Sequence, residues 1–163
     1  MKKLLFIAIT LLFTATISAQ NVRVSGNRIV VDGNEIATIE RLGCRAASPQ
    51  CIYYIRNSDG KLLITIVEMD FIDPAEQNQI NPTGIVRYLR FSFADDRGIA
   101  EILNPALLNT RPRDIARIIA TSRLINENEL DEREVRNFVQ AHGTFFSDRE
   151  RELDRSRIII HHQ

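Results

Sequence analysis

The amino-acid sequence predicts an α+β fold, in which an antiparallel meander sheet of about six strands is followed by two or three C-terminal helices packed on one face. The first supporting observation is Asp59-Gly60, which separates two apolar, β-prone runs, the pattern of a β-hairpin. Second, similar apolar–turn–apolar patterns recur around Gly33 and Gly98. Third, the chain beyond position 110 shows helical spacing of its apolar residues.

Residues 1–19 have the order of a secretory signal peptide. Lys2 and Lys3 precede an apolar run, and the small residues Ser18 and Ala19 follow it. The run is shorter than the roughly 20 residues of a membrane-spanning helix, although an uncleaved anchor remains the alternative. We therefore expect an exported protein, in the bacterial periplasm or outside the cell, with no membrane span after cleavage.

The rest of the chain divides into a single α+β domain at 20–146 and a segment at 147–163 that is a charged helix or a loose tail. Loss of Lys2 and Lys3 would leave acidic residues in slight excess over basic ones. Nucleic acid as a partner then has no electrostatic support.

The predicted strands follow one another along the first two thirds of the domain. They cover residues 22–24, 28–31, 35–41, 52–56, 61–71, 85–94 and 99–103, with the short, half-polar segment 35–41 at a sheet edge. The strand 61–71 is apolar in both of its alternating sets of side chains, so we expect both of its faces to be covered.

Cys44 and Cys51 precede the central hairpin and flank a short loop that contains Pro49. An oxidising compartment permits a disulfide between them, and closing so short a ring stabilises the fold by about 2.5 kcal/mol. Their spacing does not match that of a metal site.

Two helices are predicted after the sheet. Thr110 is expected to cap the first, with Pro112 in its first turn. Asp131 and Glu134 have the spacing of a capping box for the second, and Gly143 is expected to end it. Beyond it, Ile158–Ile160 are an apolar terminal patch that could form an extra edge strand or contact a partner.

Successive connections in a meander alternate between the two ends of the sheet. The Cys loop at 42–51 and the long polar loop at 72–84 are therefore expected at the same end, and long loops on a rigid scaffold often carry function. The candidate binding residues at this end are Arg45, Gln50, Asp70, Asp73 and Glu76, with Gln77 and Asn78 beside them.

No nucleophile elbow, phosphate-binding loop, dinucleotide fingerprint or metalloprotease motif is present in the sequence, so it points to no catalytic residue, cofactor or metal. The first hypothesis is a small exported non-enzymatic protein that binds a protein or small molecule at the long-loop end. One alternative is a hydrolase-like enzyme using carboxylates near Glu68, Asp70 and Asp73, although a solvated strand end explains the first two. Another is an inhibitor or assembly factor acting through Ile158–Ile160.

Overall fold

The structure is a computed structural model that describes residues 20–44, 51–104 and 110–160, with side chains through Ser156. It confirms the α+β class and the meander: seven antiparallel strands lie in one sheet in their sequence order, and helices follow. The expected signal peptide at 1–19 lies outside the described residues.

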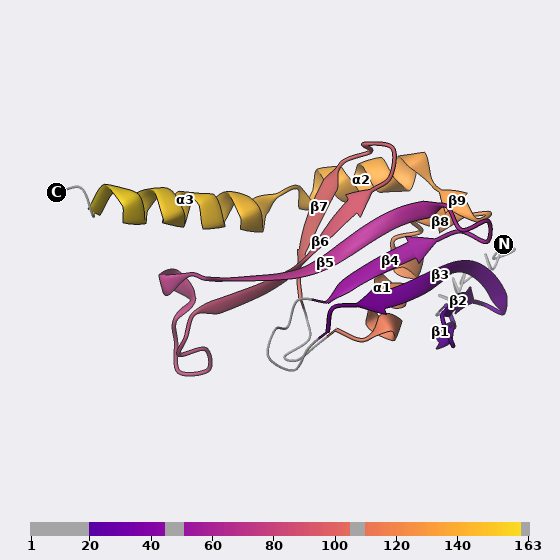
Figure 1. Cartoon of the computed structure of the whole chain (residues 1–163), viewed down its shortest axis with the longest axis horizontal. Helices are drawn as coiled ribbons and strands as arrows, with labels where there is room; N and C mark the ends of the chain where they lie inside the picture. Colours follow the sequence, from indigo (N-terminus) through magenta and orange to yellow (C-terminus); the bar gives the residue numbers. More distant parts are fainter. Residues whose placement is uncertain (1–19, 45–50, 105–109, 161–163) are drawn as a thin grey trace, which may run out of the picture.

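Each strand pairs with the next one along the chain, as Figure 1 shows, so segment 35–41 lies between two strands and the expectation of a sheet edge there was wrong. The strands are β1 (Val22–Ser25), β2 (Arg28–Val31), β3 (Asn34–Leu42), β4 (Ile52–Arg56), β5 (Leu62–Ile72), β6 (Ile85–Phe93) and β7 (Ile99–Leu103).

β5 and β6 are the central pair, and together they extend beyond the rest of the sheet. β4 pairs with β5 only as far as Val67, whereas β6 pairs with it as far as Ile72. The last residues of this pair therefore project as a two-stranded arm that carries the loop 73–84 at its tip (Figure 1). This projection determines where the long loop lies.

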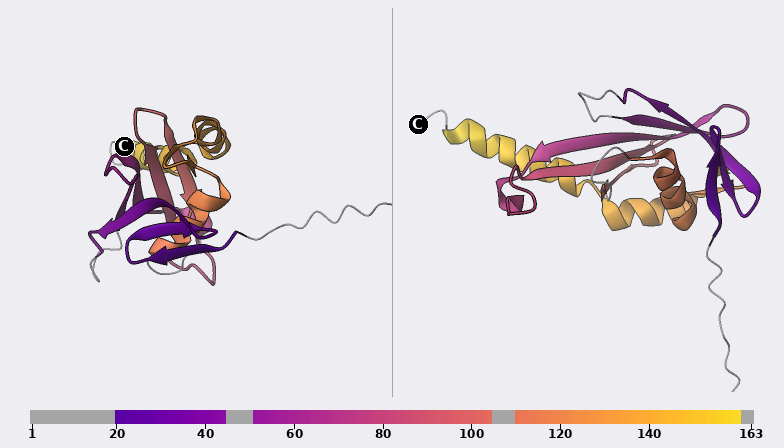
Figure 2. Two further views of the ribbon diagram at one scale, coloured as in Figure 1. Left: turned by 90° about the vertical axis from the view of Figure 1, so that its right-hand side faces the viewer. Right: turned by 90° about the horizontal axis from the view of Figure 1, so that it is seen from below.

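Three α-helices and some short elements follow or interrupt the sheet. They are the 3-10 helix η1 (Pro74–Glu76), α1 (Pro112–Thr121), the strands β8 (Ile125–Asn126) and β9 (Glu129–Leu130), α2 (Glu132–His142) and α3 (Phe145–Ile160). α1 and α2 lie on the same side of the sheet, and β1 and β2 curl round α1 (Figure 2).

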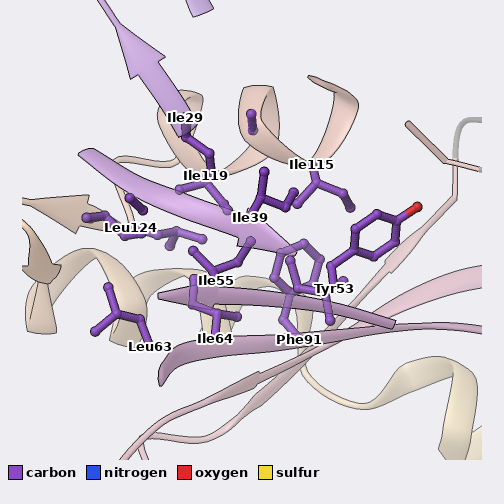
Figure 3. Packing of buried hydrophobic residues seen from close by; sticks show 14 of the residues in the cluster. Ile29, Ile39, Tyr53, Ile55, Leu63, Ile64, Phe91, Ile115, Ile119 and Leu124 are labelled. Atoms are coloured by element: carbon purple, nitrogen blue, oxygen red, sulfur yellow. The ribbon is translucent and has the colours of Figure 1, made fainter. Parts of the chain in front are cut away.

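The hydrophobic core fills the space between the sheet and these two helices. Ile115 and Ile119 of α1 face the sheet residues Ile39 and Ile55 (Figure 3), and all of these side chains are buried. Phe138 of α2 packs against the rings of Phe91 and Phe93 in β6. The expected packing of two helices on one face is therefore confirmed.

The start of α2 follows the sequence prediction, whereas the start of α1 does not. The Asp131 carboxylate accepts the backbone N–H groups of Arg133 and Glu134 at 3.0 and 3.1 Å, and Gly143 caps the other end of α2. The N-cap of α1 is Arg111 rather than Thr110. Thr110 is unsuited to capping because it is fully buried and bonded to the sheet.

α3 contacts the opposite face of the sheet from α2. Tyr88 and Phe91 are three residues apart in β6, so their side chains point to opposite faces of the sheet. On the face away from α2, the ring of Tyr88 stacks on Phe146 of α3 at a centroid distance of 5.2 Å. The Glu101 carboxylate, on the same face, accepts the backbone N–H of Ser147 at 2.9 Å. The charged C-terminal segment is therefore a helix whose first turns are anchored, and Ile158–Ile160 belong to this helix rather than to a strand.

The second face of β5 is less covered than its composition suggests. Ile64 and Ile66 are buried on the helix side, but Thr65, Val67 and Met69 are only half-buried. α3 covers this face at its far end, where Phe71 is buried. The expectation that both faces would be covered thus holds for one face and only part of the other.

Candidate functional site

A groove of about 710 Å³ lies where the projecting arm of β5 and β6 meets the first turns of α3. Its apolar lining includes Phe71, Ile80, Ile85, Val86, Leu103, Phe145 and Phe146, and its polar lining includes Asp73, Glu76, Arg87, Asn104 and Arg149. A mainly apolar surface with a few polar groups is typical of ligand sites, and the volume lies within their usual range of about 300–1,000 Å³.

Asp73 and Arg149 hold the two walls of the groove together. Arg149 donates from Nε to Asp73 Oδ2 at 2.7 Å and from Nη2 to Asp73 Oδ1 at 3.1 Å. The Asp73 carboxylate also accepts the N–H of Ala75 at 3.0 Å, which starts η1. The hydrogen bond from Arg149, with that from Ala75, lowers the pKa of Asp73 below its ordinary value. The carboxylate is therefore ionised and committed to the pair.

The loop at the tip of the arm is ordered by its own asparagines. Asn78 Oδ1 accepts the N–H groups of Ile80 and Asn81 at 2.8 and 2.9 Å. Gly84 has a φ of +66°, and a Cβ at this position would lie 2.5 Å from the Asp73 carbonyl oxygen. Only glycine suits this turn, because it tolerates both the positive φ and the close backbone approach.

Several large apolar side chains at the groove are exposed to solvent. Ile80 is 95% exposed, Phe145 68% and Leu103 61%, and all three line the groove. Single exposed apolar residues are common on soluble proteins, whereas a group of them around a concavity marks an interaction site. The groove is therefore the candidate functional site.

The predicted binding residues are only partly brought together here. Asp73 and Glu76 line the groove. Asp70 lies within β5, opposite Arg87 in the register, and is not part of the groove lining. Arg45 and Gln50 lie outside the described residues, so the structure does not place them.

The strand ends beside the two loops that were expected at one end of the sheet lie at different distances along it. The Cys51 carbonyl accepts the N–H of Glu68 at 2.9 Å, so the disulfide end of β4 is level with the middle of β5. The long loop begins beyond Ile72, which at about 3.3 Å per residue is roughly 13 Å further along the strand. The start of β4 and the end of β5 thus point towards the same end of the sheet, but the end of β5 lies further along it.

The sequence suggested that Glu68 lies at a solvated strand end, but in the structure this residue is buried. The residue is 5% exposed, and its Oε1 accepts the N–H of Thr110 at 2.7 Å. The Tyr53 hydroxyl donates to the Thr110 carbonyl beside it. Burial, with the nearby Glu68 charge as the second cause, raises the pKa of Tyr53 to about 12. This cluster fixes the chain that leads into α1.

The α3 side of the groove was not predicted from the sequence. Phe145, Phe146 and Arg149 belong to a helix whose remaining residues are mostly charged, which favoured a solvated element. Phe145-Phe146 immediately before the charged run is the signal that could have indicated a docked first turn. Leu103, at the end of β7, gave no signal of its own.

A scan against protein-family models, a search of curated proteins and a search of solved structures each find no match to this chain. Cys44 and Cys51 form a disulfide, as predicted. Within residues 20–44, 51–104 and 110–160, no helix has the length and apolar character to cross a membrane.

Proposed function

We propose that this chain is an exported, non-enzymatic binding module, and that its groove takes an apolar segment of a partner protein. The observation that carries the proposal is the exposure of Ile80, Leu103 and Phe145 around one concavity. Leaving such side chains in water is unfavourable by about 25 cal/mol per Å² of apolar surface, and a partner that covers them removes this penalty.

The walls of the groove support this use because they are held before any partner arrives. The Asp73–Arg149 pair joins the loop to α3, and the Phe146–Tyr88 stack joins α3 to the sheet. A preformed site loses less conformational entropy when it binds, so more of the contact energy appears as affinity. The charged groups at the rim would orient the partner rather than supply most of the affinity.

Binding is favoured over hydrolysis by the state of the carboxylates. Glu68 is buried and bonded to Thr110, and Asp73 is paired with Arg149. Each carboxylate is therefore bonded to another residue of the fold. The two carboxylates do not face a common substrate site. A general acid or base must reach the reacting group directly or through one water.

Export is supported by the disulfide, since stable disulfides are typical of oxidising compartments. The Cys44–Cys51 bond is compatible with a protein of the periplasm or the extracellular space. A partner would then be sought among envelope and secreted proteins.

The proposal is tested by capturing partners from envelope and culture fractions with the tagged full chain and its variants. Phe145→Ser alters the groove, whereas Leu42→Ser is the matched control, because Leu42 is a 45% exposed apolar residue outside the groove lining. We expect that the wild type and Leu42→Ser capture the same partner proteins. Phe145→Ser should fail to capture them. Equal capture by all three proteins would contradict the groove as the binding site.

A further inference from the structure

The two sulfur atoms of the disulfide differ in their access to solvent. Cys44 follows the end of β3 and is half-buried, whereas Cys51 directly precedes β4 and is 0% exposed within the core cluster. An external thiolate therefore reaches Cys44 Sγ far more easily than Cys51 Sγ. Attack at Cys44 makes the buried Cys51 sulfur the leaving group.

Arg41 lies against both sulfur atoms. Its Nε is 2.7 Å from Cys44 Sγ, and its Nη2 is 3.3 Å from Cys51 Sγ. A disulfide sulfur is a weak, neutral acceptor, whereas a thiolate carries a full negative charge. The same guanidinium contact is therefore worth more after reduction than before it. A cation in this position lowers the pKa of the released thiol and speeds its departure.

The charge of Arg41 is not neutralised by an ion pair with any other residue in the described part of the chain. Its guanidinium lies 6.0 Å from the centre of the Tyr53 ring. Glu68 and Arg41 act in opposite senses on the pKa of Tyr53, and the Glu68 Oε1 is bonded to the N–H of Thr110. Among the described residues, Arg41 is therefore the charged group that contacts both sulfur atoms.

We propose that Cys44–Cys51 is a thiol–disulfide exchange site for an external dithiol, with Arg41 as the positioning residue for the leaving thiolate. One thiolate of the dithiol attacks Cys44 Sγ and forms a mixed disulfide. The Cys44–Cys51 bond breaks, and its electron pair stays on Cys51 Sγ, which faces Arg41. The second thiol of the dithiol loses its proton to water and attacks the mixed disulfide. Cys44 is released as a thiolate, and the protein has gained the two electrons that the dithiol has lost.

The proposal is tested by equilibrating the purified full-chain product with dithiothreitol at graded ratios of its reduced and oxidised forms. The reduced fraction is read by alkylation and mass spectrometry. At a pH above the pKa of the released thiol in both proteins, Arg41→Gln should lower the equilibrium constant for reduction by roughly tenfold, the effect of about one pKa unit. Arg41→Lys should restore most of it. The matched control is Arg56→Gln, because Arg56 lies at the opposite end of β4 and bonds to Gly60.

A second measurement needs no variant, so the proposal can be tested even if Arg41→Gln fails to fold. The pH dependence of alkylation of the reduced wild type, followed separately at Cys44 and at Cys51 by mass spectrometry of their peptides, reports the pKa of the Cys51 thiol. We expect a pKa clearly below the ordinary value of about 8.5, despite burial that would otherwise raise it. A pKa at or above that value, or equal equilibrium constants for the wild type and Arg41→Gln, would overturn the proposal.

Discussion

Arg149 and Asp73, 76 residues apart in the sequence, form a two-point ion pair between α3 and the loop that follows β5. The pair is one of the contacts that place a mostly charged helix beside the projecting arm of the sheet. Because the groove lies between these two elements, its shape depends on this pair.

Replacing Asp73 with Asn should loosen the first turns of α3. Asn keeps the size of the side chain but removes the charge that Arg149 pairs with, and a charge-assisted pair is stronger than a neutral hydrogen bond. We expect faster amide hydrogen exchange over residues 146–153 in Asp73→Asn. The matched control is Asp148→Asn, because Asp148 pairs with Arg151 within the same helix at an exposed site. Equal exchange in both variants would mean that the Asp73 pair does not hold the helix.

The same contact predicts how α3 responds to acid. Arg149 lowers the folded-state pKa of Asp73, whereas an unfolded Asp titrates near pH 3.9. The stabilisation is therefore fully present above about pH 4 to 5 and is lost as the pH falls through the lower, folded-state pKa. Glu152 also pairs with Arg149, at 3.6 Å, and contributes its own acid response. Asp73→Asn should therefore lose only the share of the acid response that comes from Asp73. Hydrogen exchange of residues 146–153 from pH 6 to pH 3 measures it, and an identical acid response in both proteins would contradict the assignment.

Tyr53→Phe should destabilise the domain, because it leaves the buried Thr110 carbonyl without its donor. The expected loss in unfolding free energy is about 1–3 kcal/mol, measured by denaturant titration. Tyr54→Phe is the matched control, since Tyr54 is the half-buried neighbour whose side chain points to the other face. A similar effect of both substitutions would show that the Tyr53 hydroxyl has no special role.

Alkaline titration provides an independent readout for the same residue. The pKa of Tyr53 is raised to about 12 from an unfolded value near 10. The neutral hydroxyl therefore stabilises the fold below about pH 10, and this contribution is lost as the pH rises from 10 towards 12. Burial also raises the pKa of Tyr88, so we expect a smaller alkaline loss of stability in Tyr53→Phe than in the wild type. Tyr54→Phe should retain the full loss.

Expression of the full chain in an exporting bacterium should yield a protein that begins at Gln20. The reason is the basic start, apolar run and small residues that end at Ala19. Intact-mass measurement of the periplasmic and culture fractions checks this. Recovery of the intact chain, beginning at Met1, in the membrane fraction would favour the uncleaved anchor instead.

Local signals predicted much of the fold. The Asp59-Gly60 turn and the start of α2 at Asp131 are specified by residues close together in the sequence, so propensity and capping rules reach them. Once the strands were recognised, the meander order followed because consecutive strands are usually neighbours in a sheet. The position of the long loop at one end of the sheet followed from the same order.

The remaining features depend on contacts between distant residues. Thr110 has the chemistry of an N-cap, but Glu68 and Tyr53 bind its backbone instead. The docking of α3 depends on Tyr88 and Glu101, which no pattern within 145–160 reveals. For the same reason the sequence pointed to polar loop residues as the site, whereas the groove also needs Leu103 and Phe145.

The most direct test of the binding groove is site-specific photo-crosslinking in exporting cells, with a photoreactive amino acid in place of Leu103. The same replacement at Leu42, an exposed apolar position outside the groove lining, is the control. We predict a discrete crosslinked protein from position 103 that is absent from position 42. No crosslink at 103, or the same crosslinked products from both positions, would contradict the groove as the place where this protein meets its partner.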